Sequence, residues 1–392
     1  MVDKKLHIMI IPSWYPEYNG HYMGSFFREQ ALGIHKRGCK VGVVYPELKS
    51  LRKTFDIRVL PKLISFNDDG MDTYKFRWSN WFIKSKSMQI YAFKKFGYLV
   101  FKRYVRNHGL PDVIHCQSIF NAGFLGEYIF DRHKIPYIIT EHNSGFYYKD
   151  QGFKSYYSKV LRVINKSQKC FAVSSNYAKY LNVELKSNKK WNTHHNLVND
   201  RFLNFKINNP NKNKFIFLCV SRLHAIKNID LIIKSFKIFN QQHPNSELRI
   251  VGVGSEIKNL KKLTHKHRIN KNVHFLGQKL RSEIIDEYNS CSSFIYASSF
   301  ETFGVIFVES MSLGRPIISI SCGSSEEIIP EYAGIIVKNK TTEDMSNAMI
   351  KLFKDYFKYN PQKIREYCKS KFSEEVLSLK MIREYKSVLR NK

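Results

Sequence analysis

The chain has 392 residues, with 64 Lys and Arg against 33 Asp and Glu, which gives a formal net charge of +31 at pH 7. A length above about 250–300 residues predicts two domains rather than one core, and a hydrophobic content of 43% excludes wholesale disorder. The seven cysteines are scattered and never stand in CxxC spacing, which argues against a disulfide framework or a zinc site. With no signal-peptide pattern and no membrane-spanning apolar run, we expect a cytoplasmic protein.

Short apolar runs rich in β-branched residues alternate with helical patterns along almost the whole chain. Such near-continuous apolar strands, separated by helices, are typical of parallel sheets that are covered on both faces. Expected strands are 6–12, 40–46, 112–118, 136–142, 169–175, 214–222, 247–254, 272–278, 292–299 and 315–320, with helices at 25–38 and 121–133 between the early ones.

The alternation breaks at 196–214, which is rich in Asn and lacks periodicity. We therefore expect an α/β protein of two Rossmann-like, doubly wound domains, 1–200 and 201–375, that face each other across a cleft. A final helix, 376–392, is expected to pack back toward the first domain. In such sheets ligands bind beyond the carboxyl ends of the strands, so the strand-to-helix loops are the candidate site.

Two basic residues follow the strand FIFLCV directly. Arg222 stands at the strand end and Lys227 at the entrance to the next helix. A guanidinium fork and an ammonium group suit a diphosphate. The alternative is that both are ordinary surface residues in a chain with 64 basic side chains.

The stretch ETFGVIFVE places two carboxylates, Glu301 and Glu309, on either side of a predicted helix start. The backbone amides of Phe303, Gly304 and Val305 would form that helix N-terminus, which favours an anion. Phosphates would repel the two glutamates, so we expect them to accept hydrogen bonds from sugar hydroxyls. Alternatively, Glu301 caps its helix and Glu309 is an ordinary polar position.

These motifs, the segment MSLGRPIISISCG that follows them, and the N-terminal PSWYPEYNGHYMGSFFREQA together resemble the family 4 glycosyltransferases, which have the GT-B fold. The resemblance covers nearly the whole chain. It implies a retaining transfer of a sugar from a nucleoside diphosphate sugar, with no cofactor and no bound metal.

The resemblance also implies residue roles. Arg222 and Lys227 would hold the diphosphate, Glu301 the donor sugar and Glu309 the ribose. His142, in IITEHNS, matches a family histidine near the donor sugar, and its alternative is a structurally bonded side chain. Gly24 matches a loop glycine next to the donor, or is needed only for the turn before a helix that Ser25 would cap. His142, Arg222, Lys227 and Glu301 are the expected catalytic residues, and all but His142 are also expected to bind the donor.

The expected acceptor is a glycan or a polyprenyl-diphosphate-linked glycan in surface polysaccharide synthesis, such as capsule or lipopolysaccharide. Segment 77–106 holds eight Lys and Arg and no acidic residue. From Ile90 onward its apolar and basic side chains separate onto two helix faces, as in a helix that contacts an anionic membrane from the inner side. The alternative is a helix packed on its own sheet.

We expect no nucleic-acid partner, because no recognised binding module is present. The remaining alternative functions are a sugar nucleotide epimerase and a phosphorylase of similar fold.

Overall fold

The computed structural model describes residues 5–16, 24–50, 61–80, 85–146, 156–209 and 213–390. The chain divides into two compact units. Unit 1 comprises residues 1–196 with 374–392, and unit 2 comprises 197–373. The predicted boundaries lay at 200/201 and 375/376, so the observed divisions fall four and two residues earlier, and the last helix belongs to unit 1.

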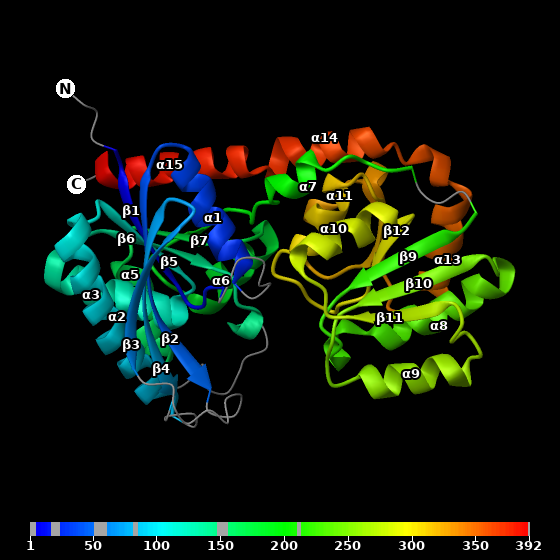
Figure 1. The fold of residues 1–392 in the computed structure, drawn as a ribbon, viewed down its shortest axis with the longest axis horizontal. Helices are drawn as coiled ribbons and strands as arrows, with labels where there is room; N and C mark the ends of the chain where they lie inside the picture. The colour runs from blue at the N-terminus through cyan, green and yellow to red at the C-terminus, as the bar shows by residue number, and fades with distance from the viewer. Residues whose placement is uncertain are drawn as a thin grey trace. The chain divides into compact units, whose positions relative to one another are not determined.

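Unit 1 is built on an eight-stranded sheet of order β3-β4-β2-β1-β5-β6-β7-β8 (Figure 1). All neighbours are parallel except β3 and β4, which form an antiparallel hairpin. The strands are β1 (His7–Pro12), β2 (Lys40–Ser50), β3 (Lys62–Asp68), β4 (Met71–Asn80), β5 (Val113–Gln117), β6 (Tyr137–Glu141), β7 (Lys169–Ala172) and β8 (Trp191–Thr193). The helices are α1 (Ser25–Lys36), α2 (Lys86–His108), α3 (Phe124–His133), α5 (Tyr157–Lys166), α6 (Ser175–Leu185) and α15 (Glu374–Arg390).

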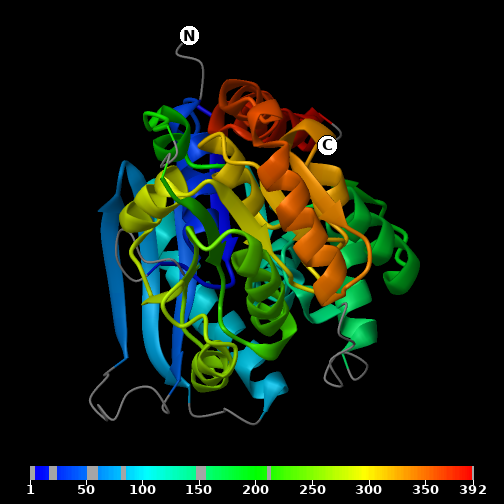
Figure 2. The same cartoon turned by 90° about the vertical axis from the view of Figure 1, so that its right-hand side faces the viewer.

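Unit 2 is a six-stranded, fully parallel sheet of order β11-β10-β9-β12-β13-β14. Figure 1 shows α8 and α9 on one side of this sheet and α10 and α11 on the other, and Figure 2 shows α8 and α13 side by side. The strands are β9 (Phe215–Val220), β10 (Ser246–Val251), β11 (Val273–Gly277), β12 (Ser293–Tyr296), β13 (Ile317–Ile320) and β14 (Gly334–Val337). The helices are α7 (Asp200–Asn204), α8 (Ile229–Gln242), α9 (Ile257–Lys266), α10 (Arg281–Ser290), α11 (Val305–Ser312), α12 (Ser325–Ile328), α13 (Thr342–Lys354) and α14 (Pro361–Phe372).

The apolar runs of the sequence form the cores of both units. Strand β1 is buried at all six positions, and β1, β2 and β5 share one core with helices α1 and α15. In unit 2, α8, α9 and α13 pack against β9, β10 and β13. All seven cysteines are buried and free, as expected of thiols inside apolar runs.

The hairpin β3–β4 was not predicted. Strand β3 lies at the sheet edge, and most of its residues are exposed, including the apolar Leu63 and Phe66, so its sequence carries no buried-strand signal. Residues 77–80, the start of the basic segment whose helical pattern was predicted only from Ile90 onward, are the end of β4.

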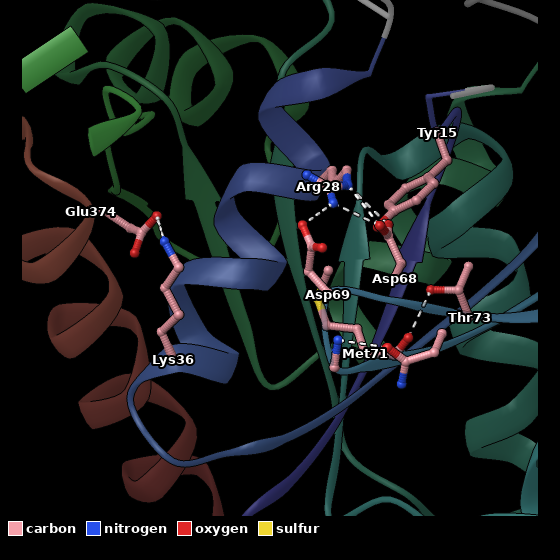
Figure 3. Close-up of polar contacts among 10 residues, drawn as sticks. Tyr15, Arg28, Lys36, Asp68, Asp69, Met71, Thr73 and Glu374 are labelled. Carbon is pink, nitrogen blue, oxygen red and sulfur yellow. Dashed lines mark hydrogen bonds and ion pairs between the residues drawn. The ribbon is translucent and has the colours of Figure 1, made fainter. Parts of the chain in front are cut away.

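Helix α1 is attached to this hairpin by an ion pair. The Arg28 guanidinium donates to the Asp68 carboxylate at 2.7 and 3.0 Å and to Asp69 at 2.6 Å, and the Tyr15 hydroxyl donates to Asp68 at 2.7 Å (Figure 3). At its other end α1 is tied to α15, where Lys36 pairs with the buried Glu374 at 3.0 Å (Figure 3).

Helix α2 buries the face that the sequence predicted to be apolar. Ile90, Phe93, Gly97, Val100, Phe101 and Tyr104 are all buried, which confirms that face. Its basic residues Lys95, Lys102, Arg103 and Arg106 are exposed, as are Tyr91 and Leu99. Trp78 is half-buried against Phe96, at 4.9 Å between ring centroids; 81–84 lie outside the described residues. No helix in the described part of the chain is long and apolar enough to cross a bilayer.

Candidate active site

The loop after β9 carries the two predicted basic residues. Arg222 follows the strand by two residues and is exposed, whereas Lys227 ends a short 3-10 turn (Ala225–Lys227) and its side chain is 17% exposed. Asn228 then adopts a left-handed conformation with φ 48° and is the N-cap residue of α8. The turn therefore points Lys227 inward and leaves Arg222 in solvent.

The Lys227 ammonium is held by three side chains, one from the last residue of the neighbouring strand β12 and two from the loop that follows it. It forms an ion pair with Glu301, donates to the Tyr296 hydroxyl at 2.9 Å, and donates to the Ser298 hydroxyl at 3.3 Å. An ammonium group has three N–H donors, so each is used. The Tyr296 hydroxyl in turn donates to Glu301 Oε1 at 2.5 Å. Burial first, and then the Glu301 carboxylate, raise the pKa of Tyr296 well above its usual value, so the hydroxyl keeps its proton.

The two loops are joined by Asn228. Its side-chain amide donates to the Ala297 carbonyl at 2.7 Å and to the Ser299 hydroxyl at 3.0 Å. The backbone N–H of Glu301 donates to the Cys322 carbonyl after β13, at 3.0 Å. Three successive strand ends of one parallel sheet thus fix the Lys227–Glu301 pair.

Helix α11 begins four residues after Glu301. Gly304 precedes it in a left-handed conformation with φ 77°, and a Cβ at this position would lie 2.6 Å from the Phe307 ring. Phe303 is buried and Val305 is the first helical residue. Glycine is therefore required here by the local backbone and packing, whatever the ligand.

Glu309 is the fifth residue of α11 and is only 4% exposed. Its Oε1 pairs with Arg281 at 2.9 Å, and its Oε2 accepts from the Tyr288 hydroxyl at 3.3 Å. Burial raises the pKa of Tyr288, and the Glu309 carboxylate adds to this. A ribose hydroxyl that bound Glu309 would have to share the carboxylate with Arg281 and Tyr288.

Unit 1 presents the predicted histidine at the end of β6. His142 is 8% exposed, and its Nε2 lies 2.6 Å from Gln117 Oε1. The Phe26 and Phe27 rings of α1 stand 5.3 and 4.9 Å from the imidazole. Burial, with His194 adding to it, lowers the pKa of His142 to about 3, so the ring is neutral near pH 7.

Glu141, directly before His142, holds the backbone around it. Its buried carboxylate accepts N–H groups of Ile119, His142 and Asn143 at 2.7–2.8 Å. Burial raises the pKa of Glu141 to about 7, against the opposing effect of these donors. The side chain therefore ties the loop after β5 to the loop after β6.

Gly24 is the N-cap of α1, with φ 74°, and a Cβ there would lie 3.0 Å from the Trp14 carbonyl oxygen. The turn alone therefore requires glycine. Ser25 was predicted as the N-cap and this is wrong: it is the first helical residue, and Gly24 provides no side-chain cap.

The structure brings Lys227 and Glu301 into direct contact and places Arg222 in the same loop as Lys227. Glu309 lies on the helix that follows Glu301 but has partners of its own. His142 and Gly24 belong to unit 1. Sequence reasoning missed the partners Tyr296, Ser298, Arg281 and Tyr288 in unit 2, and Gln117 beside His142 in unit 1. Within the described ranges no three His, Cys, Asp or Glu side chains are arranged to hold a metal ion.

Comparison with known protein families agrees with this two-unit architecture. Residues 23–202 match the family described as Glycosyltransferase Family 4, and residues 200–371 match Glycosyl transferases group 1. The chain belongs to the family 4 glycosyltransferases. Its glycosyltransferase activity follows from this membership, and both the predicted family and the predicted GT-B fold class are confirmed.

Individual proteins resemble this glycosyltransferase at low identity. An uncharacterized glycosyltransferase of Methanocaldococcus jannaschii is 25% identical over 65% of the chain and 69% of its own length. The alpha-monoglucosyldiacylglycerol synthase of Acholeplasma laidlawii is 26% identical over 67% and 71%. Among solved structures, sucrose-phosphate synthase from Thermosynechococcus elongatus has a TM-score of 0.78 at 17% identity, and the match covers 98% of this chain and 100% of the synthase. Anabaena HepE in complex with UDP has a TM-score of 0.72 at 14% identity, and the match covers 97% of this chain and 100% of HepE.

Proposed function

We propose that this glycosyltransferase transfers a sugar from a nucleoside diphosphate sugar, with UDP or GDP as the leaving group, to a glycan or lipid-linked acceptor. The transfer retains the anomeric configuration and requires no metal. The observation that carries this proposal is the Lys227 ammonium fixed beside the Glu301 carboxylate at the carboxyl ends of β9 and β12. HepE, which shares the fold, has been crystallised with UDP and with UDP-glucose, and this supports a nucleotide-sugar donor.

The diphosphate is bound by Lys227 and Arg222. All three Lys227 donors are used, and the 3.3 Å bond to Ser298 is the longest of the three. A phosphate oxygen would replace this hydroxyl while Glu301 and Tyr296 keep the ammonium in place. Arg222 is exposed and supplies a second, bidentate cation. Both charges offset the negative charge that grows on the leaving diphosphate, in place of a metal ion.

The two glutamates bind hydroxyl groups. The contacts of Glu301 with Lys227 and Tyr296 are made by Oε1, so Oε2 can accept further hydrogen bonds, and we assign it to the hydroxyl groups of the donor sugar. Glu309 is assigned to the ribose, beside Arg281. His142 of unit 1, the predicted neighbour of the donor sugar, is assigned a hydrogen-bonding role.

The proposed chemistry uses no protein nucleophile. The bond between the anomeric carbon and the phosphate oxygen breaks, the acceptor oxygen bonds to that carbon from the same face, and the acceptor proton passes to the departing phosphate. Residues of the chain only bind, orient and stabilise charge in this step.

Calorimetric titration with UDP and with GDP tests the donor site. We expect one nucleotide to bind the wild type, and Lys227→Ala to weaken its binding by about 10–100-fold, the value of one charge-assisted hydrogen bond. The control is Lys234→Ala, which removes an exposed lysine of α8 that pairs with Asp230 at 2.8 Å; its binding should match the wild type. Unchanged binding in Lys227→Ala would refute the assigned site.

We further propose that the acceptor is lipid-linked, in surface polysaccharide synthesis such as capsule or lipopolysaccharide, and that unit 1 contacts the anionic inner face of the cell membrane through the exposed side of α2. This side carries Lys95, Lys102, Arg103 and Arg106 together with Tyr91 and Leu99. The name of the Acholeplasma relative indicates a lipid acceptor for that protein, which supports this acceptor class.

Vesicle flotation tests the membrane contact. Replacing Lys95, Lys102 and Arg103 by Gln removes three charges, each worth about 1 kcal/mol at an anionic surface, so partitioning should fall about 100-fold. The matched control replaces three exposed lysines of α9 in unit 2, Lys258, Lys261 and Lys262, by Gln. Equal loss in both triple variants would show a non-specific charge effect and contradict the assignment to α2.

A further inference from the structure

A continuous row of three buried amides leads away from His142. The imidazole Nε2 lies 2.6 Å from Gln117 Oε1, Gln117 Nε2 lies 3.1 Å from Gln30 Oε1, and Gln30 Nε2 lies 2.7 Å from Asn196 Oδ1. The four side chains are 0–8% exposed. They come from the end of β6, the end of β5, the middle of α1 and the last residue before unit 2 begins.

The row has a direction. A primary amide donates through its nitrogen and accepts through its oxygen, so three amides in series can be arranged head to tail in only two ways. Here each nitrogen points toward Asn196 and each oxygen toward His142. Gln117 therefore meets the imidazole with its oxygen, and Nε2 of His142 must carry the hydrogen.

We propose that Gln117, Gln30 and Asn196 are positioning residues that hold His142 as the neutral tautomer with hydrogen on Nε2 and the lone pair on Nδ1. The role of His142 in sugar transfer rests on the proposed function; its tautomer does not. In this state Nδ1 can only accept a hydrogen bond, whatever donor faces it.

Other contacts keep the row in place. The Ser13 hydroxyl donates to the Gln117 carbonyl at 2.9 Å, which fixes the backbone at the end of β5. Glu141 accepts the backbone N–H of His142, and the Phe27 ring meets the imidazole edge to face. Burial lowers the pKa of His142 to about 3, so protonation does not reset the tautomer near pH 7. In so buried a row, reversing one amide forces the others to reverse or lose a partner.

The test is a nitrogen NMR measurement on full-length protein labelled in its histidine rings, with the His142 signals assigned from His142→Asn. In the wild type, Nε2 of His142 should have the shift of a protonated ring nitrogen and Nδ1 that of an unprotonated one. Gln30→Leu, which changes a residue that does not touch the ring, should shift or broaden these signals. It should also lower kcat about tenfold with little change in KM for the donor.

Thr140→Val is the matched control. Thr140 is 1% exposed and stands two residues before His142, but its hydroxyl lies 2.7 Å from Nε2 of His115, which is outside the row. This variant should move the His115 signals and leave those of His142 and kcat close to wild type. An unprotonated Nε2 in wild-type His142 would overturn the proposal, and so would equal effects of Gln30→Leu and Thr140→Val on the His142 ring. Both NMR results can be obtained even if no nucleotide binds, so a failure of the proposed function can be told apart from a failure of this proposal.

Discussion

Tyr296→Phe removes the one neutral hydroxyl that joins Lys227 and Glu301. The phenol oxygen accepts from the ammonium at 2.9 Å and donates to the carboxylate at 2.5 Å, and the side chain is 3% exposed. Hydrogen bonds to charged groups contribute about 1.5–3 kcal/mol each. Lys227 and Glu301 keep one another in the variant, and we therefore expect unit 2 to lose about 2 kcal/mol of stability.

For a unit of this size, such a loss lowers Tm by about 4–8 °C. The effect on activity should be larger than the effect on binding. Without the hydroxyl, the Glu301 carboxylate and the Lys227 ammonium can move relative to the donor sugar, and misplacement of about 1 Å costs up to about 100-fold in rate. We expect kcat to fall about 10–100-fold and the Kd for the nucleotide to rise less than about tenfold, because both charges remain.

Calorimetric unfolding, nucleotide titration and sugar-transfer kinetics measure these three quantities. The control is Tyr385→Phe, which removes another buried hydroxyl, 2.7 Å from His115 Nδ1 in unit 1, and should cost stability without changing transfer. A double-mutant cycle of Tyr296→Phe with Glu301→Gln should give a coupling energy of about 1–2 kcal/mol. If Tyr296→Phe only lowers Tm and leaves kcat at the wild-type value, the hydroxyl is structural and the reasoning about the pair is wrong.

Two further predictions concern unit 1. Asp68→Asn should lower the free energy of unfolding by about 2–3 kcal/mol, which is below the range for a fully buried pair because Arg28 keeps its contact with Asp69. Asp69→Asn should lower it by less than about 1 kcal/mol, since the Asp69 side chain is 58% exposed. Urea unfolding measures both values, and equal losses would contradict the assignment of Asp68 as the main partner of Arg28. Acidification below pH 6.5 should destabilise the unit, because buried imidazoles with lowered pKa values take up protons only after unfolding. Each contributes about 1 kcal/mol per pH unit near pH 5.5. Glu141, whose folded pKa of about 7 exceeds its usual 4.5, contributes a similar amount in the opposite direction and so cancels the effect of one imidazole. The imidazoles are His7, His115, His142 and His194. The net expectation is a loss of about 3–4 kcal/mol per pH unit, and stability that stays flat from pH 7 to 5.5 would contradict it.

The sequence predicted the buried strands well because their signal is local. An apolar run such as β1 or β9 can be read without knowing its neighbours, since a strand covered on both faces must be apolar throughout. Strand β3 has no such signal: it is an edge strand whose side chains are mostly exposed, and only its pairing with β4 makes it a strand.

Site residues divide in a similar way. Arg222, Lys227 and Glu301 were singled out by spacing and position at strand ends, and the structure places Lys227 against Glu301; their role in donor binding stays a prediction. Tyr296 could not be singled out, because a tyrosine at the end of an apolar strand looks like a core residue and its hydroxyl becomes informative only when β9 and β12 are known to be neighbours. The amides of Gln30 and Asn196 are separated by 166 residues, and no local pattern connects them.

The structure also gives a physical reason for a carboxylate, Glu301, beside the basic residue Lys227, which the sequence spacing alone did not provide. A lysine surrounded only by cations would be displaced toward solvent, where its flexible side chain would lose entropy on binding a diphosphate. Glu301 and Tyr296 hold the ammonium in one place, which would reduce that cost if the proposed donor site is correct. The acidic residue thus organises the basic one, and binding a sugar hydroxyl would be its second role.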